Sequence, residues 1–131
     1  MTTLPHNFKR IRLNLARSPA FPQGSAKHGY EFVAPLDGDG HIDVAAWRKD
    51  REHCRVRRFW EGEDDQVGRL EHKPGGPRGR WIFDYEPQDE DDDESGFHFE
   101  SHAFRQGEYV SIRGEDSEMH TYQVMSVTPA T

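Results

Sequence analysis

The sequence predicts a mainly β (α+β) fold: an antiparallel, partly open small β-barrel or strongly bent sheet, with one covering helix at about residues 44–53. Three observations predict it. Runs rich in β-branched and aromatic residues recur along the 131-residue chain, and segments containing Gly and Pro separate them. Several of these separating segments are short, which favours antiparallel pairing of neighbouring strands. Only one segment carries a clear helix start.

Residues 9–17 predict the first strand. Ile11, Leu13 and Leu15 alternate with polar residues, which is the period of two that a strand requires. The spacing of Phe8, Ile11 and Leu15 also fits a helix. We favour the strand because the alternation is strict.

A loop and the helix follow. Residues 18–29 are rich in Pro, Gly and Ser and predict a loop, and residues 30–34 predict a short strand that ends at Pro35. Asp43 is then a good cap for a helix at 44–53, because its carboxylate can accept the free backbone N–H groups of the first turn.

The middle of the chain predicts a meander of three more strands. The predicted strands are 55–60, 66–73 and 79–85, and the turns that join them are 61–65 and 74–78. Trp81, Phe83 and Tyr85 share one face of their strand by the period of two. We expect all three to be buried at the aromatic centre of the core.

A returning strand and a hairpin complete the predicted sheet. Residues 97–104 return to the sheet, and the hairpin consists of residues 108–113, a polar turn at 114–118 and residues 119–127. The run Gly-Glu-Tyr-Val-Ser-Ile with Tyr-Gln-Val-Met-Ser-Val resembles the hairpins of SH3-like small β-barrels. The whole chain is similar to a family of small conserved-hypothetical bacterial proteins of unknown function, and this resemblance implies no activity.

Length and composition favour one domain spanning 1–131, whose core depends on the 8 Phe, 4 Tyr and 3 Trp. The single cysteine, Cys54, excludes an intrachain disulfide and favours the cytoplasm. No apolar run is long enough to span a membrane, so we expect no membrane partner. Residues 87–96 hold a run of acids, and we expect them to form a mobile acidic loop.

The charge is unevenly distributed. The net charge is −7, yet residues 1–30 hold five Lys or Arg and no acid. Basic strands that also carry aromatic rings can bind single-stranded nucleic acid by phosphate contact and base stacking. The candidate ligand or nucleic-acid surface is Arg10, Arg12, Arg55, Arg57 and Trp60. The alternative is that these arginines form an ordinary solvent-facing side of a sheet, and the acidic net charge favours that alternative.

A candidate metal site lies at His98, Glu100 and His102. In an extended segment these three side chains project to the same side, and two imidazoles with a carboxylate could bind Zn²⁺ or Fe²⁺. The alternative is a polar strand face without a metal. The sequence names no fourth ligand, so we expect metal-free protein and no other cofactor.

The sequence contains no nucleophile elbow, phosphate loop or dinucleotide fingerprint. It therefore favours a non-catalytic, cytoplasmic binding module whose partner is another protein. The alternative is a metal-dependent enzyme that uses His98, Glu100 and His102. The third hypothesis is a single-stranded nucleic-acid-binding protein.

Overall fold

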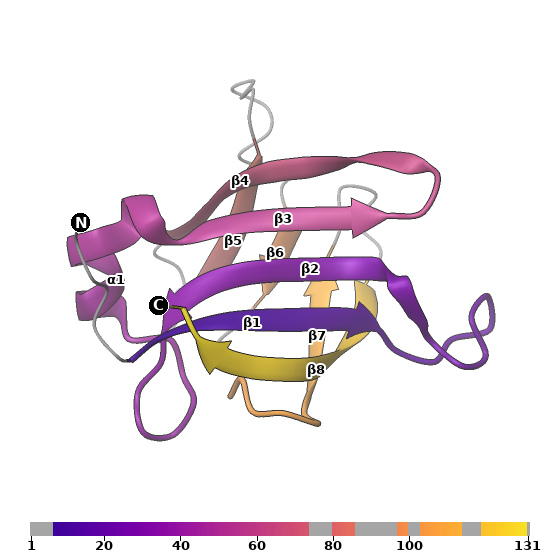
Figure 1. Ribbon diagram of the computed structural model, residues 1–131, viewed down its shortest axis with the longest axis horizontal. Helices are drawn as coiled ribbons and strands as arrows, with labels where there is room; N and C mark the ends of the chain where they lie inside the picture. The colour runs from indigo at the N-terminus through magenta and orange to yellow at the C-terminus, as the bar shows by residue number, and fades with distance from the viewer. Residues whose placement is uncertain (1–6, 74–79, 86–96, 100–102, 114–118, 131) are drawn as a thin grey trace.

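The computed structural model describes residues 7–73, 80–85, 97–99, 103–113 and 119–130. The described chain forms eight strands, one short α-helix and one 3-10 turn (Figure 1). In chain order the elements are β1 (Phe8–Leu15), β2 (Ser25–Pro35), α1 (Val44–Asp50), η1 (Arg51–His53), β3 (Arg55–Trp60), β4 (Glu63–Lys73), β5 (Arg80–Tyr85), β6 (Phe97–Phe99), β7 (Tyr109–Arg113) and β8 (Met119–Pro129). The strand at the start of the chain is thus confirmed over its helical alternative.

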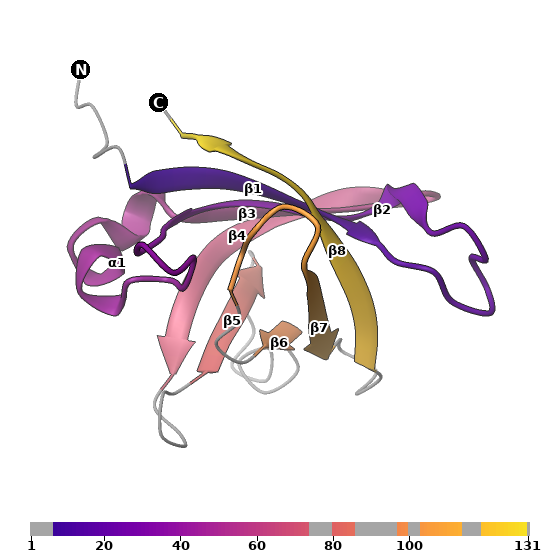
Figure 2. The same ribbon diagram turned by 90° about the horizontal axis from the view of Figure 1, so that it is seen from below.

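The strands pair antiparallel in sequence order, and β8 pairs back with β1 to close a barrel. Figure 2 shows how strongly the sheet curls, and it places α1 and the β1–β2 connection at opposite ends of the molecule. The ring is uneven: every residue of β1 has a partner in β2, whereas within the described residues β6 and β7 are joined in register by His98 and Arg113 alone. The predicted fold class, a mainly β antiparallel barrel with one helix, is confirmed.

Aromatic rings fill the inside of the barrel. The ring centroid of Phe83 lies 5.0 Å from that of Tyr30 and 5.2 Å from that of Phe32. Trp81 and Phe83 are both buried in the core, as predicted. Only the backbone of Tyr85 is described, so the prediction of its burial falls outside the described side chains. These large rings contribute much of the buried area, and aliphatic residues pack around them in the same core.

Helix α1 closes one end of the barrel. Asp43 caps it as predicted, because its Oδ1 accepts the N–H of Ala46 at 3.1 Å. Trp47 then anchors the helix: its Nε1 donates to the carbonyl of Leu70 at 2.9 Å, and its ring meets that of Trp81 edge to face at 5.4 Å. The helix is shorter than predicted, because the backbone tightens into η1 after Asp50.

Strand β2 begins at Ser25, earlier than predicted. The sequence prediction assigned Gly29 to a loop, but Gly29 pairs with Asn14 of β1 and Phe59 of β3 inside the sheet. A Cβ at this position would overlap the carbonyl oxygen of Leu13. This glycine therefore permits close approach of a neighbouring strand and does not mark a turn.

Strand β4 also begins earlier than predicted, at Glu63. The turn before it consists of Glu61 and Gly62, shorter than the predicted turn at 61–65, and Gly62 takes a positive φ of 87°. The acids that follow pair with basic residues of β3: Asp65 Oδ2 lies 3.0 Å from Arg57 Nη1. Acidic residues, which favoured a turn in the sequence, here act as cross-strand partners.

Strand β6 is described over Phe97–Phe99, and residues 100–102 of the predicted strand lie outside the described residues. Phe104, the predicted last residue of that strand, is buried outside any strand. Strand β8 continues two residues beyond the predicted end, to Pro129. The predicted turns at 74–78 and 114–118 and the predicted acidic loop at 87–96 lie outside the described residues.

Candidate interaction surface on the outer face of the barrel

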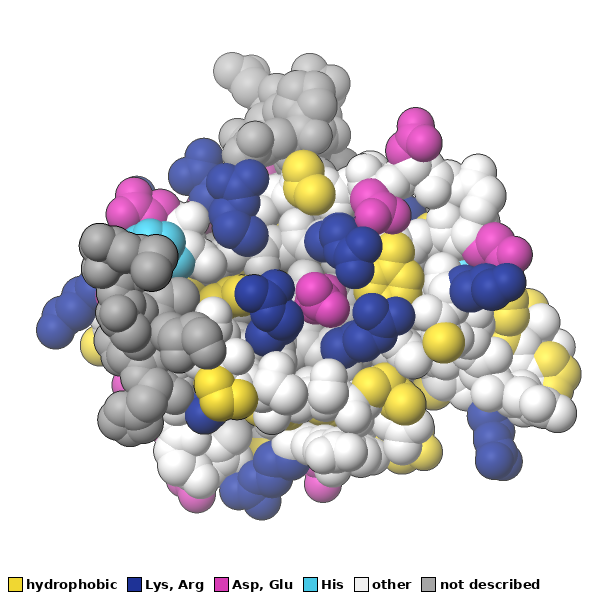
Figure 3. Space-filling model, in the orientation of Figure 1, with side chains coloured by type: hydrophobic (Ala, Val, Ile, Leu, Met, Phe, Trp, Pro, Cys, Tyr) yellow, Lys and Arg dark blue, Asp and Glu magenta, His cyan; other side chains and the backbone are white. Residues whose placement is uncertain are grey.

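The period of two in β1 and β3 separates an apolar inner side from a basic outer side. Ile11 and Val56 are buried in the core, so their neighbours Arg10 and Arg57 project outward. Arg69 of β4 lies opposite Arg55 and on the same side. We call this surface the basic face; its outward arginines are Arg10, Arg12, Arg55, Arg57 and Arg69. Figure 3 shows Lys and Arg side chains gathered over β1 to β3 around an acidic side chain.

Glu31 occupies the centre of the basic face. It lies in register with Arg12 on one side and with Arg57 on the other. Its Oε1 is 3.6 Å from Arg10 Nη1, and its Oε2 is 3.7 Å from Arg12 Nη1. One carboxylate therefore forms ion pairs with two guanidinium groups. Such exposed pairs add little to stability. Arg12 is held more firmly, because it also donates to Asn14 Oδ1 and to the carbonyl of Ala26 at 3.1 Å each.

Phe59 lies beneath the arginines on the same outer face. The Cζ atom of Arg12 is 4.4 Å from its ring centroid and that of Arg57 is 5.3 Å away, so the ring is covered and only 8% exposed. The ring lies over Gly29, where a Cβ would come within 3.1 Å of it. Guanidinium groups stack well on aromatic rings, and their N–H groups at the edge can still donate to a partner.

The structure brings together four of the five residues of the predicted surface. Arg10, Arg12, Arg55 and Arg57 share the basic face, but Trp60 does not. As the direct neighbour of Phe59, Trp60 projects to the opposite side of β3 and packs against the core. There its ring meets His28 at 4.4 Å, and Arg58 stacks on it at 4.5 Å.

The predicted surface left out the two residues that organise this face, Phe59 and Glu31. The signal for Phe59 was present, because it follows Arg55 and Arg57 at intervals of two. Glu31 could not be found in this way, since its partners come from a different strand.

The candidate metal site is not tested by the described residues. The backbone of His98 lies in β6, opposite Ile82 and Arg113, but its side chain is not described. Glu100 and His102 lie outside the described residues. Within the described part of the chain, no three His, Cys, Asp or Glu side chains are grouped to hold a metal.

Cys54 is buried in the core, and its environment disfavours the thiolate. Burial, together with the nearby carboxylates of Asp50 and Glu71, raises the pKa of the thiol to about 12. His53 is exposed and faces Asp50, with 3.9 Å between its Nδ1 and the carboxylate. The described geometry therefore gives no thiolate–imidazole pair and no activated nucleophile.

Comparisons with protein-family models, curated proteins and solved structures give no match. No described helix is long and apolar enough to cross a membrane. What characterises the molecule is thus its own geometry: an antiparallel β-barrel with an arginine-rich outer face.

Proposed function

We propose that this protein is a binding module whose basic face docks an acidic segment of a partner protein. The observation that carries the proposal is the stacking of Arg12 and Arg57 on Phe59, with Glu31 between them. Protein interfaces are enriched in arginine and aromatic residues. Arginines that are already held in place lose little conformational freedom when a partner binds, and this favours affinity.

Val67 gives the same surface an apolar contact point. It lies opposite Arg57 in the β3–β4 pair and is 47% exposed. An acidic segment that carries an apolar side chain would thus find guanidinium groups and an apolar surface side by side. This combination suits a protein segment better than a bare polyanion.

A protein partner is favoured over single-stranded nucleic acid for a structural reason. Base stacking requires an open aromatic ring, whereas Phe59 is covered by Arg12 and Arg57, and Trp60 lies on the other side of the strand.

The proposal includes a cytoplasmic location, which the single cysteine supports because no intrachain disulfide can form. The resemblance of the last hairpin to SH3-like barrels, which are common in binding modules, and the similarity to bacterial conserved-hypothetical proteins belong to the same proposal. Neither resemblance names a partner.

The test is fluorescence anisotropy with a labelled poly-glutamate peptide that has a central leucine. We expect saturable binding that weakens as salt rises, because exposed charges are screened. Replacing Arg10, Arg55 and Arg57 together by Gln should weaken binding by about tenfold or more, as expected when several charged contacts are lost. These three substitutions leave Arg12 stacked on Phe59, so part of the basic face is kept.

A matched control removes the same charge from α1 and η1, outside the basic face. Arg48, Lys49 and Arg51 are all exposed on α1 and η1, and changing them to Gln should leave peptide affinity within about twofold. Equal loss in both triple variants would show a mere net-charge effect and contradict the proposal. Tighter binding of oligo-dT than of the peptide, with the same dependence on Arg55 and Arg57, would favour nucleic acid instead.

A further inference from the structure

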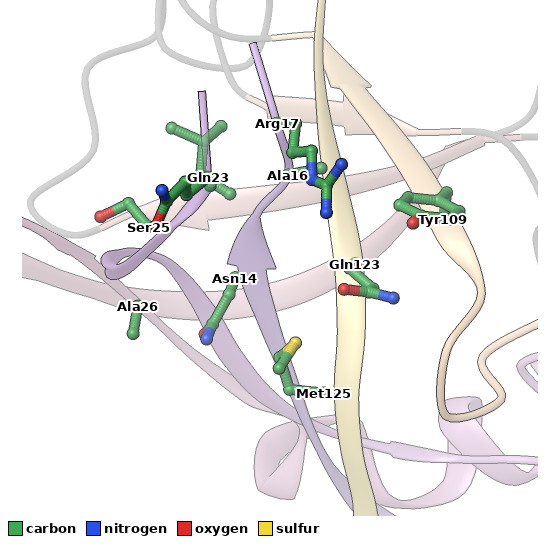
Figure 4. Close-up of a pocket in the computed structure, with 11 residues that line it drawn as sticks. Asn14, Ala16, Arg17, Gln23, Ser25, Ala26, Tyr109, Gln123 and Met125 are labelled. Carbon is green, nitrogen blue, oxygen red and sulfur yellow. The ribbon is translucent and has the colours of Figure 1, made fainter. Parts of the chain in front are cut away.

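A second surface with different chemistry lies beside the basic face, at the end of the barrel away from α1. It is a groove of about 640 Å³ between the β1–β2 connection and the β7–β8 pair (Figure 4). This volume lies within the range of small-molecule sites. Its polar and larger lining residues are Asn14, Arg17, Gln23, Ser25, Tyr109, Gln123 and Met125.

Two amide side chains give the groove a defined donor and acceptor. Asn14 Oδ1 accepts from Arg12 Nε at 3.1 Å, so the amide N–H groups of Asn14 remain to donate elsewhere. Gln123 Nε2 donates to the carbonyl of Gly107 at 3.4 Å, which leaves its Oε1 to accept. A ligand with both acceptor and donor atoms would satisfy the two amides.

The charge of the groove is positive. Arg17 is the one charged residue in its lining, and it makes no ion pair with any described residue. No carboxylate lines the groove. A ligand group that approaches Arg17 should therefore be an anion, which its guanidinium can bind by paired hydrogen bonds.

The groove also contains an open aromatic ring. Tyr109 is 60% exposed, and Met125 is 41% exposed. Figure 4 shows Tyr109, Gln123 and Arg17 around the same opening, with Met125 farther along β8. An exposed tyrosine face offers a stacking surface for a planar ring, and methionine sulfur packs well against aromatic groups.

We propose that the groove binds a small ligand in which a planar heteroaromatic ring is joined to an anionic group, as in a nucleoside monophosphate. The ring stacks on Tyr109, its edge meets the amides of Asn14 and Gln123, and the anion binds Arg17. A simple aromatic acid lacks the ring donors and acceptors that the two amides select. This inference is independent of the function proposed for the basic face.

Isothermal titration calorimetry with AMP, CMP, GMP and UMP tests the proposal. We expect at least one of them to bind saturably with a stoichiometry of one. Tyr109→Leu should weaken binding about tenfold through lost stacking, and Arg17→Gln should do so through the lost anion contact. Tyr109→Phe keeps the ring and should stay within about threefold of the unchanged protein. Arg48→Gln, which removes the same charge on α1, should have no effect.

Two fragments of the best monophosphate separate the two contacts. The corresponding nucleoside lacks the phosphate, so Arg17→Gln should not change its affinity. Ribose 5-phosphate lacks the base, so Tyr109→Leu should not change its affinity. The proposal is overturned if no monophosphate binds at millimolar concentration, or if neither substitution weakens binding. It is equally overturned if ribose 5-phosphate binds as tightly as the nucleotide, since the groove would then be a simple anion site.

The same titrations distinguish the groove from the basic face. The Arg10, Arg55 and Arg57 triple variant should keep its nucleotide affinity, and Tyr109→Leu should keep its affinity for the acidic peptide. Competition between peptide and nucleotide for the groove, abolished by Tyr109→Leu, would instead identify a peptide as its occupant and contradict a small-molecule site.

Discussion

Phe59 and Phe83 are both buried phenylalanines of the same barrel, but they are buried by different partners. Phe83 is fully enclosed by core residues, with Tyr30 and Phe32 as aromatic neighbours. Phe59 is covered on the outer face by the guanidinium groups of Arg12 and Arg57. A core ring excludes water permanently, whereas a ring under charged side chains is covered by groups that can also contact a partner. The comparison teaches that burial alone does not distinguish a core residue from part of an interface.

The largest effect is expected from the inner ring. Phe83→Ala should lower the free energy of unfolding by about 3–5 kcal/mol, because the surrounding rings cannot close the cavity. Urea titration followed by circular dichroism measures this loss. Val67→Ala on the exposed side should cost less than about 0.5 kcal/mol. A similarly small loss for Phe83→Ala would mean that the inside of the barrel is not tightly packed.

Gly29, on which the outer ring lies, should give the next largest effect. Gly29→Ala should destabilise the protein by about 2–3 kcal/mol, since its Cβ would overlap a backbone carbonyl and crowd Phe59. Gly38→Ala is the matched control, because a Cβ there meets no atom within 4 Å and should change stability by less than about 1 kcal/mol. Equal stability of both variants in the same urea titration would show that β1, β2 and β3 can separate freely.

The outer ring itself should give the smallest effect. Phe59→Ala should cost about 1–2 kcal/mol, less than Phe83→Ala, because Arg12 and Arg57 can collapse into the space or extend into water. A double-mutant cycle of Phe59→Ala with Arg12→Gln should give a coupling of about 0.5–1 kcal/mol. Arg10 shares Glu31 with Arg12, but no described contact places it on the ring, so its coupling to Phe59 should be near zero. If Arg10 and Arg12 showed equal coupling to Phe59, the coupling would arise from their shared partner Glu31 and not from stacking on the ring.

Much of the fold could be predicted from the sequence because local patterns decide it. The alternation of Ile11, Leu13 and Leu15 identified β1, and Asp43 identified the helix start. The boundaries that failed, at Gly29 and at 63–65, depend on partners in other strands. Glycine and acidic residues usually indicate turns, and only tertiary pairing overrides that preference here.

The candidate surfaces were less predictable than the fold. The sequence named four arginines of the basic face because they cluster along the chain, but it grouped Trp60 with them from its neighbouring position alone. The groove was not predicted, because Arg17 comes from a segment far in sequence from the hairpin that holds Tyr109 and Gln123, and the two parts meet only when β8 pairs with β1.

Cys54 carries a buried thiol that should be chemically unreactive in the folded protein. Because its folded-state pKa of about 12 exceeds the ordinary value of 9.0, the folded protein holds this proton more tightly than the unfolded chain. The resulting stability is present below about pH 9 and is lost as the pH rises toward 12. Around neutral pH the buried thiol should escape oxidants and alkylating reagents. A cysteine introduced on the basic face or in the groove would then be the sole reactive thiol, and a dye attached there would report on that surface alone.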